Sequence, residues 1–258
     1  MNLRNTTFLL AFLVFSAFAA EVPRLSVPHA EEAPIIDGNL SDAVWAGAAH
    51  IDGLKPAIDA AADLPAPPQT TVRVLWSETH LYVAYDCVDD EVYSSGTLNH
   101  DDNLFSEDVV EVFLDGKGDG QQFVEIQCSP DGTNLDLMYV YSSETKPGED
   151  GRIDSAIIRT DRWGFREWEM WGLRTAARKT DKGWSAEFAI PVGSIVQRLG
   201  RKTLEKGLEL HAHFVRYDYV PAADGTTDER RLLQQTWNPV LTGNPHNSPF
   251  HMGVLVLE

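Results

Sequence analysis

Cysteine and basic residues are scarce in this sequence. Two cysteines among 258 residues, Cys87 and Cys128, cannot support a scaffold held by several disulfides. Lysine and arginine number 21 against 39 aspartate and glutamate, so the formal net charge is -18. Nucleic acids and anionic membrane surfaces both attract basic surfaces, and this composition therefore argues against either partner. An acidic chain suits cations, or a neutral ligand such as a sugar.

Motifs for common cofactors and catalytic sites are also missing. The sequence contains no Gly-x-Gly-x-x-Gly, no Walker loop, no Gly-x-Ser-x-Gly elbow and no EF-hand or Cys/His zinc spacing. We therefore expect no organic cofactor and a protein that is not an enzyme. A glycoside hydrolase stays an alternative, because its paired carboxylates are recognised by their separation in space.

Only one long hydrophobic run is present, at the N-terminus. Apolar residues run from Phe8 to Ala20 after the basic Arg4, with small residues at 17 and 19. This order is typical of a secretory signal peptide, and the run is too short to span a bilayer. We expect a signal peptide over 1–20, a single domain over 21–258, a secreted or periplasmic location and no membrane span. In that compartment the two cysteines either form a disulfide or stay as buried thiols.

The stretch from Ser106 to Asp115 predicts a central strand. Apolar residues fill nearly every position from Val109 to Leu114, which is typical of a strand covered on both faces. Glu111 interrupts this pattern, and a buried carboxylate without a partner is costly. Either Glu111 is salt-bridged, or Glu111 and Asp108 face a ligand or a metal at one end of a sheet.

Alternating apolar residues predict further strands along most of the chain. The predicted strands are 71–76, 81–88, 123–128, 134–141, 171–177, 182–191, 208–219 and 252–257, separated by turns rich in Gly, Pro, Asn and Asp. Pro191 also suits the start of one short helix over 192–199. This spacing of strands and turns predicts an all-β fold, an antiparallel β-sandwich.

Two clusters of residues invite a functional reading. Acidic residues follow the strand 81–88, and Asp89, Asp90 and Asp108 are candidate ligands of Ca²⁺, which takes six to eight oxygens. The alternative for the acidic run is a solvated loop.

Aromatic residues gather between 163 and 171. We expect Trp171 to pack at the start of a strand, whereas Trp163 faces either a ligand or the core.

Several short motifs, in order along the chain, resemble the family 9 carbohydrate-binding modules and their relatives. They are Ile36-Asp37-Gly38-Asn39-Leu40-Ser41-Asp42-Ala43-Val44-Trp45, Asp108-Val109-Val110-Glu111-Val112-Phe113-Leu114-Asp115, Ser129-Pro130-Asp131-Gly132, Gly183-Trp184-Ser185-Ala186-Glu187-Phe188-Ala189-Ile190-Pro191 and His246-Asn247-Ser248-Pro249. The resemblance covers nearly the whole chain after the signal peptide. It implies a jelly-roll-like antiparallel β-sandwich with structural Ca²⁺, and a module that accompanies enzymes of polysaccharide breakdown.

The resemblance also implies a set of ligand-binding residues. Sugar-binding members of the family clamp a saccharide end between two tryptophans and bind it through polar side chains. The two clamp positions fall at Phe105 and His246, the clamp carboxylate falls at Glu111, and a clamp arginine falls near Glu125, where it is not kept. The full candidate set is Phe105, Glu111, Arg216, Trp237, Asn244 and His246.

These observations favour an exported, non-catalytic protein that binds a carbohydrate in a groove by aromatic stacking and by carboxylate and amide hydrogen bonds. The first alternative is a protein-interaction or cell-surface structural sandwich that has lost the sugar clamp. The second is a haem-binding sandwich for electron transfer, with Met138 or Met252 paired with His213 or His246 as axial ligands.

Overall fold

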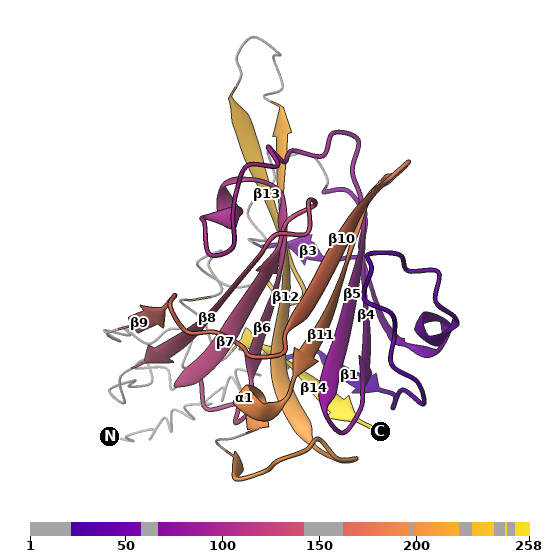
Figure 1. Ribbon diagram of the computed structural model, residues 1–258, viewed down its shortest axis with the longest axis vertical. Helices are drawn as coiled ribbons and strands as arrows, with labels where there is room; N and C mark the ends of the chain where they lie inside the picture. Colours follow the sequence, from indigo (N-terminus) through magenta and orange to yellow (C-terminus); the bar gives the residue numbers. More distant parts are fainter. Residues whose placement is uncertain are drawn as a thin grey trace, which may run out of the picture.

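The computed structural model describes residues 22–57, 67–141, 162–196, 199–221, 229–239, 246 and 251–258. These residues form two β-sheets that pack face to face (Figure 1). The described helical segments are short: η1 (Ala43–Gly47), η2 (Leu104–Ser106) and α1 (Gly193–Val196). No helix among the described residues is long and apolar enough to cross a membrane. The predicted all-β sandwich is confirmed.

The larger sheet, sheet A, has nine strands. Its main path runs β1-β14-β12-β6-β7-β8-β9, and β13 and β3 branch from β12. The strands are β1 (Arg24–Val27), β3 (Lys55–Pro56), β6 (Val109–Asp115), β7 (Gln122–Cys128), β8 (Asn134–Tyr141), β9 (Arg162–Phe165), β12 (Glu209–Pro221), β13 (Arg230–Thr236) and β14 (Gly253–Leu257). The long β12 runs through the middle of the molecule, and it pairs with β6, β13 and β14 (Figure 1).

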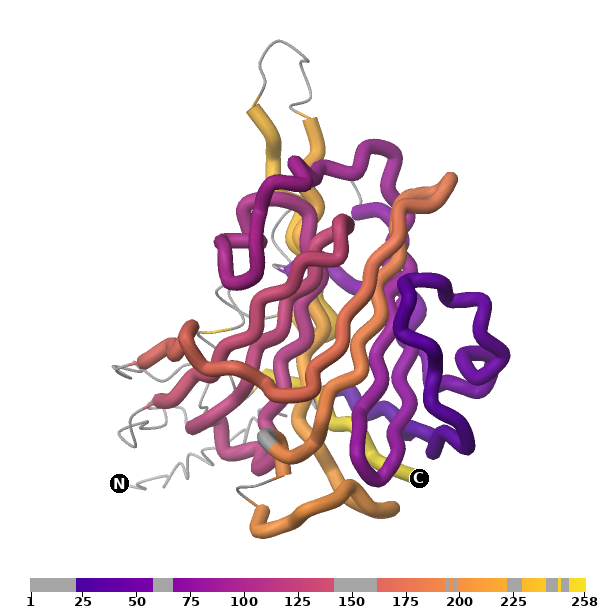
Figure 2. Tube along the Cα trace, viewed as in Figure 1, coloured from indigo at the N-terminus to yellow at the C-terminus, as the bar shows by residue number. Residues whose placement is uncertain are grey.

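The smaller sheet, sheet B, has five strands in the order β10-β11-β5-β4-β2. They are β2 (Ala49–Asp52), β4 (Thr70–Trp76), β5 (His80–Val88), β10 (Arg174–Thr180) and β11 (Gly183–Pro191). The hairpin predicted between residues 71 and 88 is present as β4 and β5. The N-terminal segment, indigo in Figure 2, lies along the β4 side of this sheet.

The core lies between the sheets and is filled by alternate residues of the facing strands. Val110, Val112 and Leu114 of β6 point into it, where they join apolar residues of sheet B. Cys87 on β5 and Cys128 on β7 are also buried there, and both are free thiols.

The prediction for Trp171 is wrong, since its side chain is 89% exposed. The strand starts three residues later than predicted, at Arg174, and Trp171 lies in the preceding turn. A backbone hydrogen bond from the N–H of Trp171 to the carbonyl of Glu169 holds that turn, so its side chain projects outward.

The side chain of Glu187 connects two of the motifs listed above, residues 36–45 and residues 183–191. Its carboxylate is fully buried on β11 and accepts bonds from the indole Nε1 of Trp45 at 2.8 Å and from the backbone N–H groups of Asp37 at 3.0 Å and Gly38 at 2.7 Å. Gly38 has a φ of +82°, and a Cβ there would lie 2.7 Å from the Ala177 carbonyl carbon. The turn at 37–38 and Trp45 are thus fixed to sheet B by one side chain.

We predict that Glu187→Ala lowers the free energy of unfolding by about 2–5 kcal/mol, because three buried donors lose a charged acceptor. Urea denaturation measures this loss. Glu31→Gln, on an exposed side chain, is the control and should change stability by less than about 0.5 kcal/mol. A loss in Glu187→Ala no larger than in the control would contradict this account.

Candidate functional site

The outer face of sheet A, which points away from sheet B, carries a group of buried polar side chains. Val112 on β6 and Ile126 on β7 enter the core, so strand alternation places Glu111, Glu125 and Gln127 on the opposite face. The pairing of β12 with β6 and β13 adds residues from both of these strands. We name this group the outer-face cluster; its members are Glu111, Glu125, Gln127, His213, Thr236 and His246.

One amide joins the two carboxylates of the cluster. The Nε2 of Gln127 donates to Oε1 of Glu111 at 2.9 Å and to Oε1 of Glu125 at 2.5 Å. Both glutamates are 1% exposed. Both amide hydrogens of Gln127 are therefore used within the cluster.

His246 comes from a distant part of the sequence and closes the cluster on one side. Its Nε2 donates to Oε2 of Glu125 at 2.6 Å, which fixes the ring's tautomer. Its ring meets Phe113 and Tyr139 edge-on, with centroids 5.2 and 4.9 Å apart. The hydroxyl of Tyr141 donates to the His246 carbonyl, so the backbone is held as well.

Three polar atoms of the cluster are buried without a hydrogen-bond partner among the described residues: Oε2 of Glu111, Oε1 of Gln127 and Nδ1 of His213. The other ring nitrogen of His213 bonds the hydroxyl of Thr236. Buried polar atoms are nearly always satisfied, so each of these atoms can take one further partner.

Burial controls the charges in the cluster. Desolvation raises the pKa of Glu111 well above its usual range, and the nearby charge of Glu125 raises it further. Desolvation lowers the pKa of His213 to about 3, with a smaller contribution from His251, so His213 is neutral at pH 7.

Aromatic rings surround these polar groups. Phe113, Phe123, Tyr139, Tyr141 and Tyr217 pack together on this face. The centroid of Phe123 lies 5.2 Å from that of Tyr139 and 5.5 Å from that of Tyr141. A ring of this kind can stack on an apolar ligand face while the carboxylates and the amide bond its polar groups.

The predicted ligand-binding residues divide between two places. Glu111 and His246 meet in the outer-face cluster. Phe105 lies in η2, is 40% exposed, and its carbonyl accepts a bond from the Tyr219 hydroxyl at 2.8 Å, at the end of the same face. Asn244 lies outside the described residues.

Arg216 and Trp237 do not lie on the outer face. Trp237 packs in the core against Phe214, with ring centroids 5.5 Å apart. Arg216 on β12 points between the sheets and is fully buried. The structure thus separates these two residues from Glu111 and His246.

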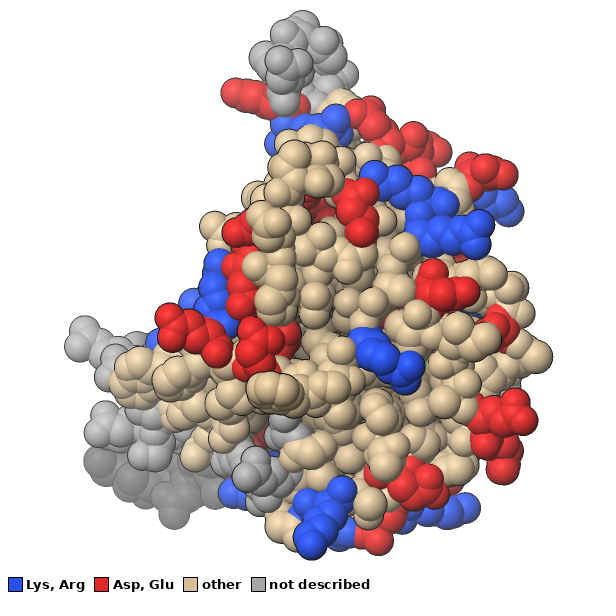
Figure 3. Space-filling model, in the orientation of Figure 1, with Lys and Arg blue, Asp and Glu red and all other residues tan. Residues whose placement is uncertain are grey.

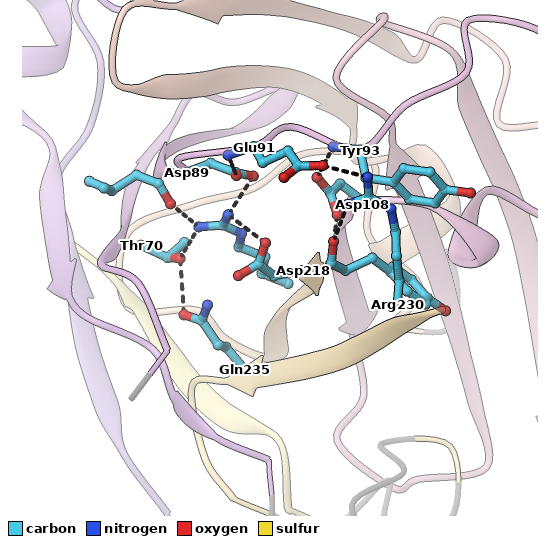
Figure 4. A network of polar contacts seen from close by, with 11 residues as sticks. Thr70, Asp89, Glu91, Tyr93, Asp108, Asp218, Arg230 and Gln235 are labelled. Atoms are coloured by element: carbon cyan, nitrogen blue, oxygen red, sulfur yellow. Dashed lines mark hydrogen bonds and ion pairs between the residues drawn. The ribbon is translucent and has the colours of Figure 1, made fainter. Parts of the chain in front are cut away.

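Arg216 contacts several members of a second polar network, of which Figure 4 labels Thr70, Asp89, Asp218 and Gln235. One terminal nitrogen donates to Oγ1 of Thr70 at 3.1 Å and to the carbonyl of Val88 at 2.8 Å. The other lies 2.9 Å from Oδ2 of Asp89 and 3.3 Å from Oδ1 of Asp218. We name Thr70, Asp89, Asp108, Arg216, Asp218 and Gln235 the interior cluster.

Asp108 completes this network through backbone contacts. Its two carboxylate oxygens accept bonds from the N–H groups of Tyr93 at 2.6 Å and Tyr219 at 2.7 Å. Burial raises the pKa of Asp108 to about 7 in spite of these bonds. Burial likewise raises the pKa of Asp218 to about 6, against the opposing effect of Arg216.

Two of the three predicted metal ligands meet in the interior cluster. Carboxylate oxygens of Asp89, Asp108 and Asp218 lie within 4.8 Å of one another, whereas Asp90 is not part of this group. Arg216 already supplies a cation there. Among the described residues, Oδ2 of Asp218 is the one carboxylate oxygen of these three aspartates that has no hydrogen-bond partner. Because Ca²⁺ takes six to eight oxygens, these residues do not fit it well.

A second possible metal group lies on the surface. His100, Asp101 and Glu169 each offer one atom within the same separation. An imidazole is not a calcium ligand of choice, so this group does not fit Ca²⁺ either.

Comparison with known families identifies the fold. The family model for "Carbohydrate family 9 binding domain-like" matches residues 36–258. The chain belongs to this family. A search of curated proteins finds no match to the sequence.

Solved structures of similar shape carry related descriptions. A putative carbohydrate-binding protein from Bacteroides uniformis has a TM-score of 0.63 at 15% identity, covering 92% of this chain and 100% of its own. A family 9 module from Caldicellulosiruptor kristjanssonii in complex with cellotriose has a TM-score of 0.60 at 15% identity, covering 91% and 93%. The same module in complex with glucose gives 0.59 at 16% identity, covering 91% and 95%. At these identities the likeness shows the fold.

Five members of the two clusters were not predicted from the sequence: Thr70, Gln127, Asp218, Gln235 and Thr236. Alternation could have indicated Gln127, because it shares a strand face with Glu125 and lies two residues away. Asp218 shares a face with Arg216 for the same reason. Thr236 lies on β13, a strand whose polar sequence gave no signal.

We predict that Arg216→Met lowers the free energy of unfolding by about 3–5 kcal/mol, because buried carboxylates lose their cation. The matched control is Arg24→Met, which breaks an exposed ion pair with Glu209 and should cost less than about 1 kcal/mol. Equal losses in the two variants, measured by urea denaturation at pH 7, would show that the interior cluster does not depend on Arg216.

Glu111 should make stability depend on pH. Its pKa is higher in the folded protein than in the unfolded chain, where it lies near 4.5. The stability it contributes is therefore fully present below about pH 4.5 and is lost as pH rises toward the folded pKa. Compared with Glu111→Gln, the wild type should lose up to about 1.4 kcal/mol per pH unit in that window.

Urea denaturation of both proteins at several values between about pH 4 and pH 8 measures this difference. The raised pKa values of Asp108 and Asp218 act equally in both proteins and cancel in the comparison. A difference that does not change with pH would contradict the buried state of Glu111.

Proposed function

We propose that this protein binds a saccharide on the outer face of sheet A without chemically changing it. The supporting observation is that Glu111, Gln127 and His213 each hold a buried polar atom that has no partner in the part of the chain that the structure describes, next to a group of aromatic rings. A saccharide supplies both hydroxyl groups and apolar C–H faces, so it matches both features. Membership of a carbohydrate-binding family and structural neighbours in complex with cellotriose and glucose support the same function.

The proposal includes export. The predicted signal peptide over residues 1–20 is the support for a secreted or periplasmic location. In that compartment a non-catalytic binding protein would act beside enzymes of polysaccharide breakdown. The structural Ca²⁺ that the resemblance implied stays a prediction.

A second candidate function is protein interaction, and one observation favours it. Trp163 and Phe165 on the edge strand β9 are about half exposed, at 50% and 48%. Phe165 also lines a groove of about 670 Å³ together with Met138, Val140 and Trp168.

The structure does not bring Met138 and His246 together as a pair of haem ligands. His246 contacts Tyr139, and Met138 lies on the opposite face of β8 from Tyr139.

We predict that a saccharide raises the melting temperature of the protein, and that Glu111→Ala weakens its affinity about tenfold or more by removing a buried acceptor. Ligand at a hundredfold excess over its dissociation constant adds about 2.7 kcal/mol of stability. A thermal-shift screen of neutral, amino and acidic oligosaccharides, followed by titration calorimetry, measures both effects.

The control variant for this screen is Phe165→Ala, which changes the exposed groove and should bind saccharide like the wild type. If no saccharide binds, or if Glu111→Ala binds as tightly as the wild type, the proposed function is wrong. Loss of binding in Phe165→Ala alone would move the saccharide site to the groove beside β9.

A further inference from the structure

We propose that the saccharide recognised by the outer-face cluster is an amino sugar, whose protonated amine lies against Oε2 of Glu111 and Oε1 of Gln127. This inference rests on the proposed function and specifies the ligand class of the same site.

The hydrogen-bonding atoms left over in the cluster are mainly acceptors. Oε2 of Glu111 and Oε1 of Gln127 can only accept unless the carboxyl is protonated, and both are buried without a partner. The donors of Gln127 are already used by the two carboxylates. An ammonium group brings three donors and no acceptor, whereas a hydroxyl brings one donor and also needs a donor of its own. The cluster is therefore complementary to an ammonium group.

The charge of the cluster favours the same ligand. The charged neighbour that acts on Glu111 is Glu125, and it raises the pKa of Glu111 by repulsion. His213 is neutral at pH 7, and His246 bonds the oxygen of Glu125 that points away from Gln127. Arg162 on β9 lies over the ring of Tyr139, 5.3 Å from its centroid, where its charge acts on Tyr139 and Tyr141. Within the cluster, the acidic groups that a cation would meet are Glu111 and Glu125, joined by Gln127.

The surroundings fit a cation as well as a sugar ring. Phe113, Tyr139 and Tyr217 lie beside the cluster, and aromatic faces attract ammonium groups. The formal net charge of -18 raises the local concentration of cationic ligands. In the view of Figure 3 acidic side chains are spread over the surface, with basic side chains beside several of them.

A consequence is that binding should release a proton. Burial raises the pKa of Glu111 in the free protein, and an ammonium group beside it would lower that pKa again, because it favours the carboxylate. At pH values between these two pKa values, a proton would leave to the buffer as the positive charge of the ligand takes its place. A neutral sugar gives no such exchange.

The experiment compares three β-1,4-linked trisaccharides that differ only in the group at C2: a hydroxyl, an ammonium or an acetamide. Titration calorimetry near pH 6, in two buffers of different ionisation enthalpy, gives both affinity and proton release. The amino form is expected to bind about tenfold more tightly than the hydroxyl form, with a net release of protons that the hydroxyl form does not show. If the hydroxyl or acetamide form binds as tightly as the amino form, the amino-sugar inference is overturned while the proposed function stands; if none binds, both fail.

A variant and a second probe exclude general attraction of a cation to an acidic protein. Glu125→Gln is expected to lose most of the preference for the amino form over the hydroxyl form, measured as the ratio of the two affinities in the same variant. Glu31→Gln removes the same charge near Leu75 on the outer side of sheet B and should change nothing. Raising the salt concentration screens surface attraction more than a buried contact. If spermidine binds as tightly as the amino trisaccharide, or if Glu125→Gln keeps the full preference, the inference is wrong.

Discussion

A carboxylate taken out of water must find donors or a cation, and this requirement shapes the molecule at three places. Glu187 is satisfied by an indole and two backbone N–H groups, which fasten the N-terminal segment to sheet B. Asp89 and Asp218 are paired with Arg216 between the sheets, although Oδ2 of Asp218 has no partner among the described residues. In the outer-face cluster Oε2 of Glu111 also has no partner among the described residues, and no basic side chain is placed against it as Arg216 is placed against Asp218.

The two polar clusters are linked by the geometry of the strands that carry them. Along β12, Arg216 points into the sandwich, while Val215 and Tyr217 point outward. Along β13, Gln235 bonds Thr70 in the interior, and the next residue, Thr236, bonds His213 outside. The interior cluster thereby fixes the two strands that form one side of the outer face. A firmly held backbone keeps the unsatisfied acceptors in place for a ligand.

Apolar alternation was enough to predict the sandwich, the hairpin of β4 and β5, the central strand β6 and the importance of Glu111. The strand β13 was not predicted because Arg230 to Thr236 is mostly polar. Its side chains take part in polar clusters on both faces of the sheet, so the sequence does not show the alternation of apolar residues that indicates a strand. The partners of Glu111 could not be read from the sequence, since the contact of His246 with Glu125 joins residues 121 positions apart. Arg216 and Trp237 were misplaced because a motif does not reveal which face a residue occupies.

Side-chain amide signals in a proton–nitrogen NMR spectrum test the central claim most directly. Gln127 and Gln235 lie on opposite faces of sheet A, the first in the outer-face cluster and the second in the interior. During titration with the amino trisaccharide, the account predicts that the side-chain amide signals of Gln127 shift and saturate while those of Gln235 stay unchanged. Unchanged Gln127 signals at a saccharide concentration that saturates binding, or a shift of Gln235 instead, would contradict the account.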